Sequence, residues 1–150
     1  MTRTEVLLFM RAHKYAVEAS LGPSGTPQAA VVGIVVTDDF EVVFDTMADS
    51  RKAANFRRSP GIAFVIGGTQ GGDERTVQYE GTVDEPRGAE LQRLQALYFE
   101  RFPDGREREQ LPGCLYFRAR PVWIRYSNFN LTPPEIVEFR AEQLRSLPSA

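Results

Sequence analysis

A hydroxyl residue and a pair of basic residues stand at a spacing that suits the binding of an anion. Thr46 ends an apolar run, and four positions later Ser50, Arg51 and Lys52 open a segment of helical character. The first turn of a helix leaves backbone N–H groups unpaired and carries the positive end of the helix dipole. The Arg51 guanidinium can grip two phosphate oxygens, and Lys52 adds a compact charge, so together they suit a phosphate dianion.

The same pattern has a plainer interpretation. Basic residues at a helix start oppose the helix dipole, which a bound anion would offset. Solvated basic residues at helix starts are nevertheless common, and the spacing alone leaves both interpretations open.

A second polar row lies on a predicted strand at residues 75–83. Its residues alternate, so that Thr76, Gln78 and Glu80 share one face while Val77 and Tyr79 share the other. A polar row opposite an apolar one faces either solvent or a polar ligand.

The elements that position these residues follow from hydrophobic periodicity. A period of two predicts an antiparallel set of strands at residues 15–21, 29–36, 41–46, 62–66, 75–83 and 115–129. We expect strand 29–36 to be buried on both faces, the glycine-rich segment 67–72 to be a hairpin loop, and Pro121 to lie at a bend or on an edge between two strands within 115–129. Helical spacing predicts helices at residues 5–13, capped by Thr4, at 49–58, capped by Asp49 or Ser50, and at 87–102.

Composition limits the function. The 150 residues suit one domain, residues 1–150, with a peripheral tail from about residue 132 that holds a short helix. A net charge of −2 argues against nucleic-acid binding. Cys114 and His13 are each the single residue of their type, so one chain cannot supply a cysteine-rich metal site, and no metal is expected. The absence of a signal-peptide pattern and of a long apolar run predicts a cytoplasmic protein without membrane contact.

At this point the sequence resembles a known family. The order of the elements, with Thr46, then Ser50-Arg51-Lys52-Ala53 and Asn55, then a polar strand ending Gln78-Tyr79-Glu80-Gly81, resembles the pyridoxamine 5′-phosphate oxidase-like flavin-binding split barrels. The resemblance runs from about residue 14 to residue 127. It implies a mainly β fold, an antiparallel Greek-key-type FMN-binding split β-barrel with flanking helices, and FMN as the cofactor.

The resemblance also implies roles for particular residues. Ser50, Arg51 and Lys52 would clamp the FMN phosphate, and Thr46 would reach the flavin or its ribityl chain. Either Thr76 or Gln78 would contact the ring system, and the sequence does not choose between them.

The family is a homodimer that holds each flavin in a groove between subunits. This implies a homodimeric partner, with Trp123, Arg125 and Tyr126 as the nearest candidates from the neighbouring chain. Ordinary strand packing explains these three residues equally well.

Two departures from the family pattern concern the substrate. Vitamin-producing members carry an Arg and a Lys on the second strand, where this chain has the apolar run 29–36, and an Arg-x-His pair that nothing after Arg125 supplies. We therefore expect an FMN-dependent oxidoreductase acting on a small molecule other than pyridoxamine 5′-phosphate, with no catalytic side chain assigned. The alternatives are a deazaflavin-dependent reductase of the same fold and a flavin-binding module without turnover.

Overall fold

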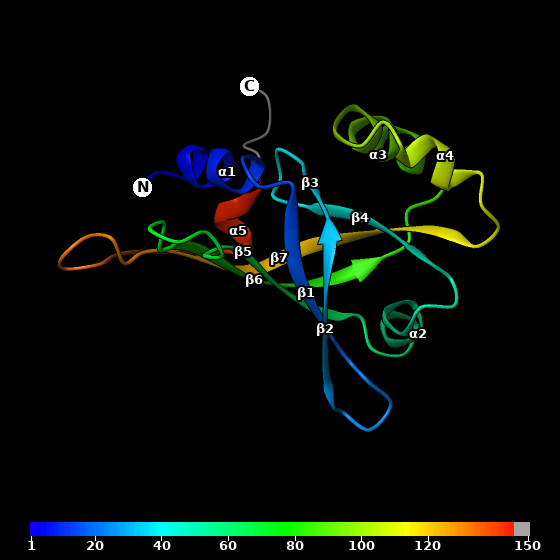
Figure 1. Ribbon diagram of the computed structural model, residues 1–150, viewed down its shortest axis with the longest axis horizontal. Helices are drawn as coiled ribbons and strands as arrows, with labels where there is room; N and C mark the ends of the chain where they lie inside the picture. Colours follow the sequence, from blue (N-terminus) through cyan, green and yellow to red (C-terminus); the bar gives the residue numbers. More distant parts are fainter. Residues whose placement is uncertain (146–150) are drawn as a thin grey trace.

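The structure is a computed structural model that describes residues 1–145, and its strands form one curled antiparallel sheet (Figure 1). The strands of the described part are β1 (Tyr15–Leu21), β2 (Pro27–Gly33), β3 (Val35–Val36), β4 (Val42–Met47), β5 (Gly61–Gly67), β6 (Arg75–Asp84), β7 (Cys114–Asn128) and β8 (Glu135–Arg140). The helices are α1 (Arg3–Arg11), α2 (Arg51–Arg58), α3 (Gly88–Arg101), α4 (Gly105–Glu109) and α5 (Ala141–Leu144).

The sheet has the strand order β2-β1-β5-β6-β7-β4-β3, and β8 pairs with β7 outside this path. Together with the flanking helices, this is a split barrel, so the predicted fold class is confirmed. Figure 1 shows the turn between β7 and β8 extending away from the barrel on the side opposite α3 and α4. None of the helices within residues 1–145 combines the length and the hydrophobicity needed to cross a membrane.

Helix α2 is fixed to the barrel by aromatic packing. The ring of Phe56 lies 6.0 Å from that of Phe44 on β4 and 5.3 Å from that of Phe117 on β7, measured between centroids. Phe64 of β5 packs edge-on against Phe44 at 5.8 Å. All four side chains are almost completely buried. Such aromatic pairs stabilise a core beyond the area they bury, so the direction of α2 is set by the core.

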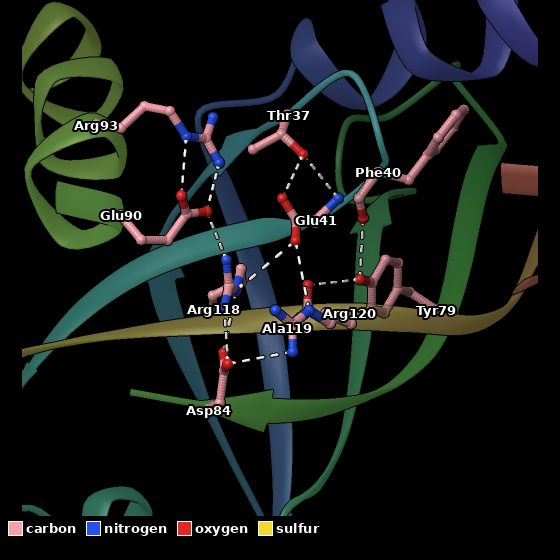
Figure 2. Close-up of polar contacts among 10 residues, drawn as sticks. All are labelled: Thr37, Phe40, Glu41, Tyr79, Asp84, Glu90, Arg93, Arg118, Ala119 and Arg120. Carbon is pink, nitrogen blue, oxygen red and sulfur yellow. Dashed lines mark hydrogen bonds and ion pairs between the residues drawn. The ribbon is translucent and has the colours of Figure 1, made fainter. Parts of the chain in front are cut away.

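An ionic network connects α3 to the sheet (Figure 2). Arg118 of β7 is buried and donates hydrogen bonds to both carboxylate oxygens of Asp84, at 3.0 and 2.7 Å, and to Glu90 of α3 at 2.7 Å. Glu41 lies 3.7 Å from the same guanidinium. Because Asp84 ends β6, the network joins two strands to the first turn of α3.

Two predictions about the N-terminal half are wrong. The apolar run after residue 27 is not buried on both faces, because β2 lies at one end of the sheet order and Val31 is 68% exposed. The side of the run that carries Val31 forms an exposed apolar surface. Helix α1 is capped by Thr2, not Thr4, because Thr2 and Glu5 form a reciprocal capping box.

Pro121 does not separate two strands. β7 is one strand of 15 residues in which Val122 has no partner on β6, since Gly81 pairs with Pro121 and Glu80 with Trp123. This bulge changes which residues face the core: Phe117 and Ala119 before it, and Ile124 and Tyr126 after it. Residues 120–122 pair with neither β4 nor β8, so the proline lies at a locally open edge, as expected for a residue without an N–H.

The segment after residue 132 contains more structure than predicted. The expected short helix is present as α5, but it is preceded by β8, which the sequence analysis missed. Leu144 of α5 is completely buried. The end of the predicted tail, residues 146–150, lies outside the described residues.

Candidate functional site

The predicted hydroxyl residues meet at the start of α2. Ser50 is the N-cap, as predicted, and its Oγ accepts hydrogen bonds from the backbone N–H of Ala53 at 3.2 Å and from the Thr46 hydroxyl at 3.0 Å. Thr46 lies near the end of β4, so the strand and the helix are joined through these two side chains. The cap fixes the position of the residues that follow it.

Arg51 and Lys52 are free of ion pairs within the described part of the chain. The first turn of α2 contains no acidic residue. The later basic residues of the same helix differ, because Arg57 pairs with Glu85 at 2.9 Å and Arg58 donates to the Leu21 carbonyl at 3.0 Å. The two cations at the positive end of the helix dipole are therefore available to an anion.

A small cavity of about 90 Å³ lies beside these cations. Arg51 and Lys52 line it from α2, Glu18 and Ser20 from β1, and Gln28, Ala29 and Ala30 from β2. A space of this size exceeds what one water molecule needs and can accept a small oxyanion. We call these seven residues and their cavity the anion pocket.

Asn55 connects two of the residues that line the anion pocket, Ser20 and Gln28. Its Nδ2 donates to Ser20 Oγ and to Gln28 Oε1, both at 2.9 Å, and its Oδ1 accepts from Arg58 at 2.9 Å. The amide is almost completely buried and joins α2 to both β1 and β2.

Sequence reasoning missed Glu18 as a pocket residue. The side chain is 2% exposed, and its Oε2 has no hydrogen-bond partner among residues 1–145. Burial raises the pKa of Glu18, and the nearby charge of Lys52 lowers it by less. A signal was present in the sequence, because Glu18 shares the inward face of β1 with the buried residues Ala16 and Ser20.

The other predicted residues lie on the outward surface of the sheet, except Tyr126, which is 1% exposed and packs in the core. Cross-strand pairing builds two rows there: Val31, Val17, Val65, Gln78, Arg125 and Glu138 in one, and Ala29, Ala19, Ala63, Glu80, Trp123 and Arg140 in the other. We call these rows the outer face. It is apolar on β2, β1 and β5 and polar on β6, β7 and β8.

A cavity of about 150 Å³ on the outer face is lined by Gln78, Trp123 and Val65, among others, whereas Thr76 does not line it. Arg125 lies opposite Gln78 and donates to Glu138 at 2.9 Å, and its guanidinium lies 5.4 Å from the Trp123 ring centre. Trp123 Nε1 also donates to Glu138, at 3.4 Å, so Glu138, on the strand that the sequence analysis missed, positions both Trp123 and Arg125. Thr76 is half-buried between Gly67 and Ser127.

The structure thus divides the eight predicted residues into two groups. Thr46, Ser50, Arg51 and Lys52 surround the start of α2, whereas Thr76, Gln78, Trp123 and Arg125 lie on β6 and β7. The two cavities share no residue and open on opposite faces of β1, because Glu18 and Ser20 point to one side of that strand and Val17 and Ala19 to the other. One chain does not bring the two groups together.

The curled antiparallel sheet and its flanking helices define the chain as a split barrel. The family model described as pyridoxamine 5′-phosphate oxidase matches residues 2–128, and the chain belongs to this family. The resemblance stated from the sequence is therefore confirmed. No curated protein sequence matches the chain.

Solved structures of the same fold differ in what their names say they bind. A heme-binding protein from Mycobacterium smegmatis has a TM-score of 0.83 at 15% identity, over 96% of this chain and 60% of that one. HutZ, a heme storage protein from Vibrio cholerae, has a TM-score of 0.70 at 16% identity, over 91% of this chain and 92% of that one. A pyridoxamine 5′-phosphate oxidase-related FMN-binding protein from Nostoc punctiforme has a TM-score of 0.61 at 14% identity, over 92% of this chain and 90% of that one. At these identities the likeness shows the fold alone.

Proposed function

We propose that the chain binds FMN, with the phosphate group in the anion pocket, and acts as an FMN-dependent oxidoreductase on a small molecule. The observation that carries this proposal is the pair of unpaired cations, Arg51 and Lys52, beside a cavity of about 90 Å³ at the start of α2. A terminal phosphate supplies the negative charge that these two cations need as a partner. Its charge is also favoured by the positive end of the helix dipole. Family membership and the FMN-binding relative support the choice of FMN.

The proposed functional unit is a homodimer. The phosphate group and the ring of one flavin would need residues from both faces of β1, which a second chain supplies by placing its outer face over the first. The apolar part of the outer face supports this, because Val31 and Val65 are 68% and 45% exposed. Exposed apolar patches of this kind are typical of interaction surfaces.

In this arrangement the chain supplies position and polarity, and FMN, when bound, supplies hydride transfer at its N5. Gln78 offers an amide donor and acceptor to a polar ring edge. Trp123 offers a flat apolar surface whose orientation is fixed by its neighbours on β7 and β8. A hydride transfer needs no general base, so no side chain is assigned as one.

Heme is a less suitable ligand for these residues. The chain's single histidine, His13, donates from Nδ1 to the Phe9 carbonyl at 2.8 Å and packs against the Phe9 ring at 4.6 Å. It precedes β1, whereas the anion pocket lies toward the other end of that strand. An imidazole ligand to iron is therefore absent from both groups of site residues.

The test is the double substitution Arg51→Ala with Lys52→Ala. Each change removes a charge-assisted contact worth roughly 1.5–3 kcal/mol, so the Kd for FMN should rise about 100-fold or more. Fluorescence titration measures the Kd, and titrations with a deazaflavin coenzyme and with heme show which ligand class binds most tightly. Arg57→Ala, which removes only an exposed ion pair with Glu85 from the same helix, is the control and should leave the Kd within a few-fold.

Equal FMN affinity for the wild type and the Arg51/Lys52 variant would contradict the phosphate assignment. Turnover is tested separately by anaerobic reduction with NAD(P)H followed by an electron acceptor. A flavin that binds but does not cycle would favour the non-catalytic binding module over the oxidoreductase.

A further inference from the structure

Glu18 is an unexpected residue for a pocket that attracts anions. It lines the anion pocket together with Arg51 and Lys52, it is 2% exposed, and its Oε2 has no hydrogen-bond partner. An ionised carboxylate in this position would repel a phosphate dianion and would itself be costly to bury. Its presence therefore needs an explanation beyond packing.

Among the groups that surround Glu18, Lys52 is its main electrostatic partner. Ala16 and Ser20 flank it on the inward face of β1, Ala30 lies opposite on β2, and Phe64 lies opposite on β5. The charged groups that line the pocket with it come from α2, and of these Lys52 is the one whose charge acts on Glu18. Burial nevertheless outweighs Lys52, so the pKa of Glu18 is raised.

An anion in the same pocket would draw Lys52 toward itself and add a negative charge beside Glu18. Both changes favour the neutral acid further. A neutral carboxylic acid is a hydrogen-bond donor, so the same side chain that opposes an anion when ionised can bind one when protonated.

We propose that Glu18 binds the phosphate group as a neutral acid, donating its proton to a phosphate oxygen, so that binding takes up a proton from solvent. This inference rests on the proposed function, because it concerns the phosphate of FMN in the anion pocket. In the bound state Glu18 holds the proton that is taken up, and Arg51 and Lys52 supply the positive charges of the site. The ligand class that the pocket selects is a phosphate monoester.

The direction of the pH dependence follows from linkage. Glu18 has a higher pKa in the complex than in the free protein, so proton uptake occurs at pH values between the two. Across that window FMN affinity falls as the pH rises, by up to about tenfold per pH unit. The phosphate of FMN does not obscure this near pH 8, because phosphate monoesters lose their second proton at about pH 6.

The experiment is calorimetric titration with FMN at a series of pH values from about 6 to 9, in buffers of different ionisation enthalpy, which counts the protons exchanged on binding. Uptake by the wild type should exceed that of Glu18→Gln, by up to one proton per FMN where the pH lies between the pKa values of Glu18 in the free protein and in the complex. Glu18→Gln keeps the shape and a donor but cannot titrate, so it should show only the exchange that the FMN phosphate itself contributes near pH 6. Riboflavin, which lacks the phosphate, should bind the wild type without uptake.

The possible results have distinct meanings. Uptake by the wild type in excess of that by Glu18→Gln supports the proposal. Equal uptake by the two proteins at every pH overturns it, and tighter binding by Glu18→Gln at every pH would identify Glu18 instead as an ionised partner that competes with phosphate for Lys52. FMN binding that is unaffected by Arg51→Ala with Lys52→Ala rejects the phosphate pocket itself, which is a separate failure.

Discussion

The buried polar side chains around α2 differ in how many of their hydrogen-bonding groups are used. Asn55 uses both its amide N–H groups and its carbonyl oxygen, and it satisfies Ser20, which is 4% exposed. Glu18 leaves one oxygen unused on the same side of β1. A fully satisfied residue acts as a structural connection, whereas an unsatisfied one marks a place where a ligand can supply the missing partner.

We expect Asn55→Ala to lower the free energy of unfolding by about 2–3 kcal/mol, because it removes three hydrogen bonds and leaves buried polar groups unpaired. Urea unfolding followed by circular dichroism measures the change. Arg57→Ala on the same helix removes a single exposed ion pair with Glu85 and should cost less than about 1 kcal/mol. An equal cost for the two variants would show that the Asn55 connections do not hold α2 to the sheet.

Among the elements, α3 depends on one arginine. Arg118 connects Asp84 at the end of β6 with Glu90 in the first turn of α3 (Figure 2). Burial alone would raise the pKa of Asp84, but the hydrogen bonds and charge of Arg118 outweigh it and lower that pKa. The pKa of Glu90 is also lowered, first by its hydrogen bond from Arg93 and then by the Arg93 and Arg118 charges. Both carboxylates therefore stabilise the fold in their ionised form.

We expect Arg118→Met to lower the free energy of unfolding by about 2–3 kcal/mol at pH 7. This is less than the loss of a fully buried pair, because Asp84 and Glu90 remain 40% and 42% exposed. Since both pKa values are lowered in the folded state, this stabilisation is present above about pH 4 and is lost as the pH falls through the folded-state values. The difference between wild type and variant should therefore shrink at pH 3.

Urea unfolding at pH 7 and pH 3 tests this expectation. Arg93→Met is the matched control, because it removes only an exposed pair with Glu90 and should cost less than about 1 kcal/mol. A difference for Arg118→Met that is the same at both pH values would mean that packing, and not charge, is responsible.

Local sequence patterns predicted those features that depend on residues adjacent in the sequence. β1 has the predicted bounds, and Ser50 caps α2, because alternation and capping chemistry are properties of adjacent residues. β8 and the exposure of β2 could not be found in this way, since both depend on which strand lies alongside. The unpaired oxygen of Glu18 likewise depends on β2 and α2 closing over β1.

For the whole molecule, the separation of the two residue groups is the main constraint. The anion pocket and the outer face are each formed within one chain, but they open on opposite sides of β1. The residues were predicted from the resemblance to the family, in which Thr46 and Ser50-Arg51-Lys52 form the most specific element, and their role in binding stays a prediction. Their division into two groups could not be predicted, because the direction of each side chain follows from strand pairing across the sheet.

We expect Val65→Glu to convert the proposed dimer into monomers, because Val65 is 45% exposed at the centre of the outer face and a two-fold interface would bury the new charge twice. The dimerisation constant should weaken by about 100-fold or more, with loss of FMN binding. Light scattering after size-exclusion chromatography measures the mass. Leu8→Glu, a similarly exposed residue on α1, is the control and should leave the mass unchanged.

A Val65→Glu protein that remains dimeric would move the interface away from the outer face. A monomer that still binds FMN as tightly as the wild type would show instead that one chain suffices for the site.

The unpaired Val122 in β7 has an evolutionary consequence. By adding one residue, it allows Phe117 and Ala119 to face the core on one side of the bulge while Trp123 and Arg125 face outward on the other. Because the bulge takes up one residue, loss of Val122 would leave Pro121 opposite Gly81 and Trp123 opposite Glu80 in a regular ladder, with Ile124 and Tyr126 still facing the core. Descendants of this chain can therefore change or delete residue 122 without turning either half of the strand over.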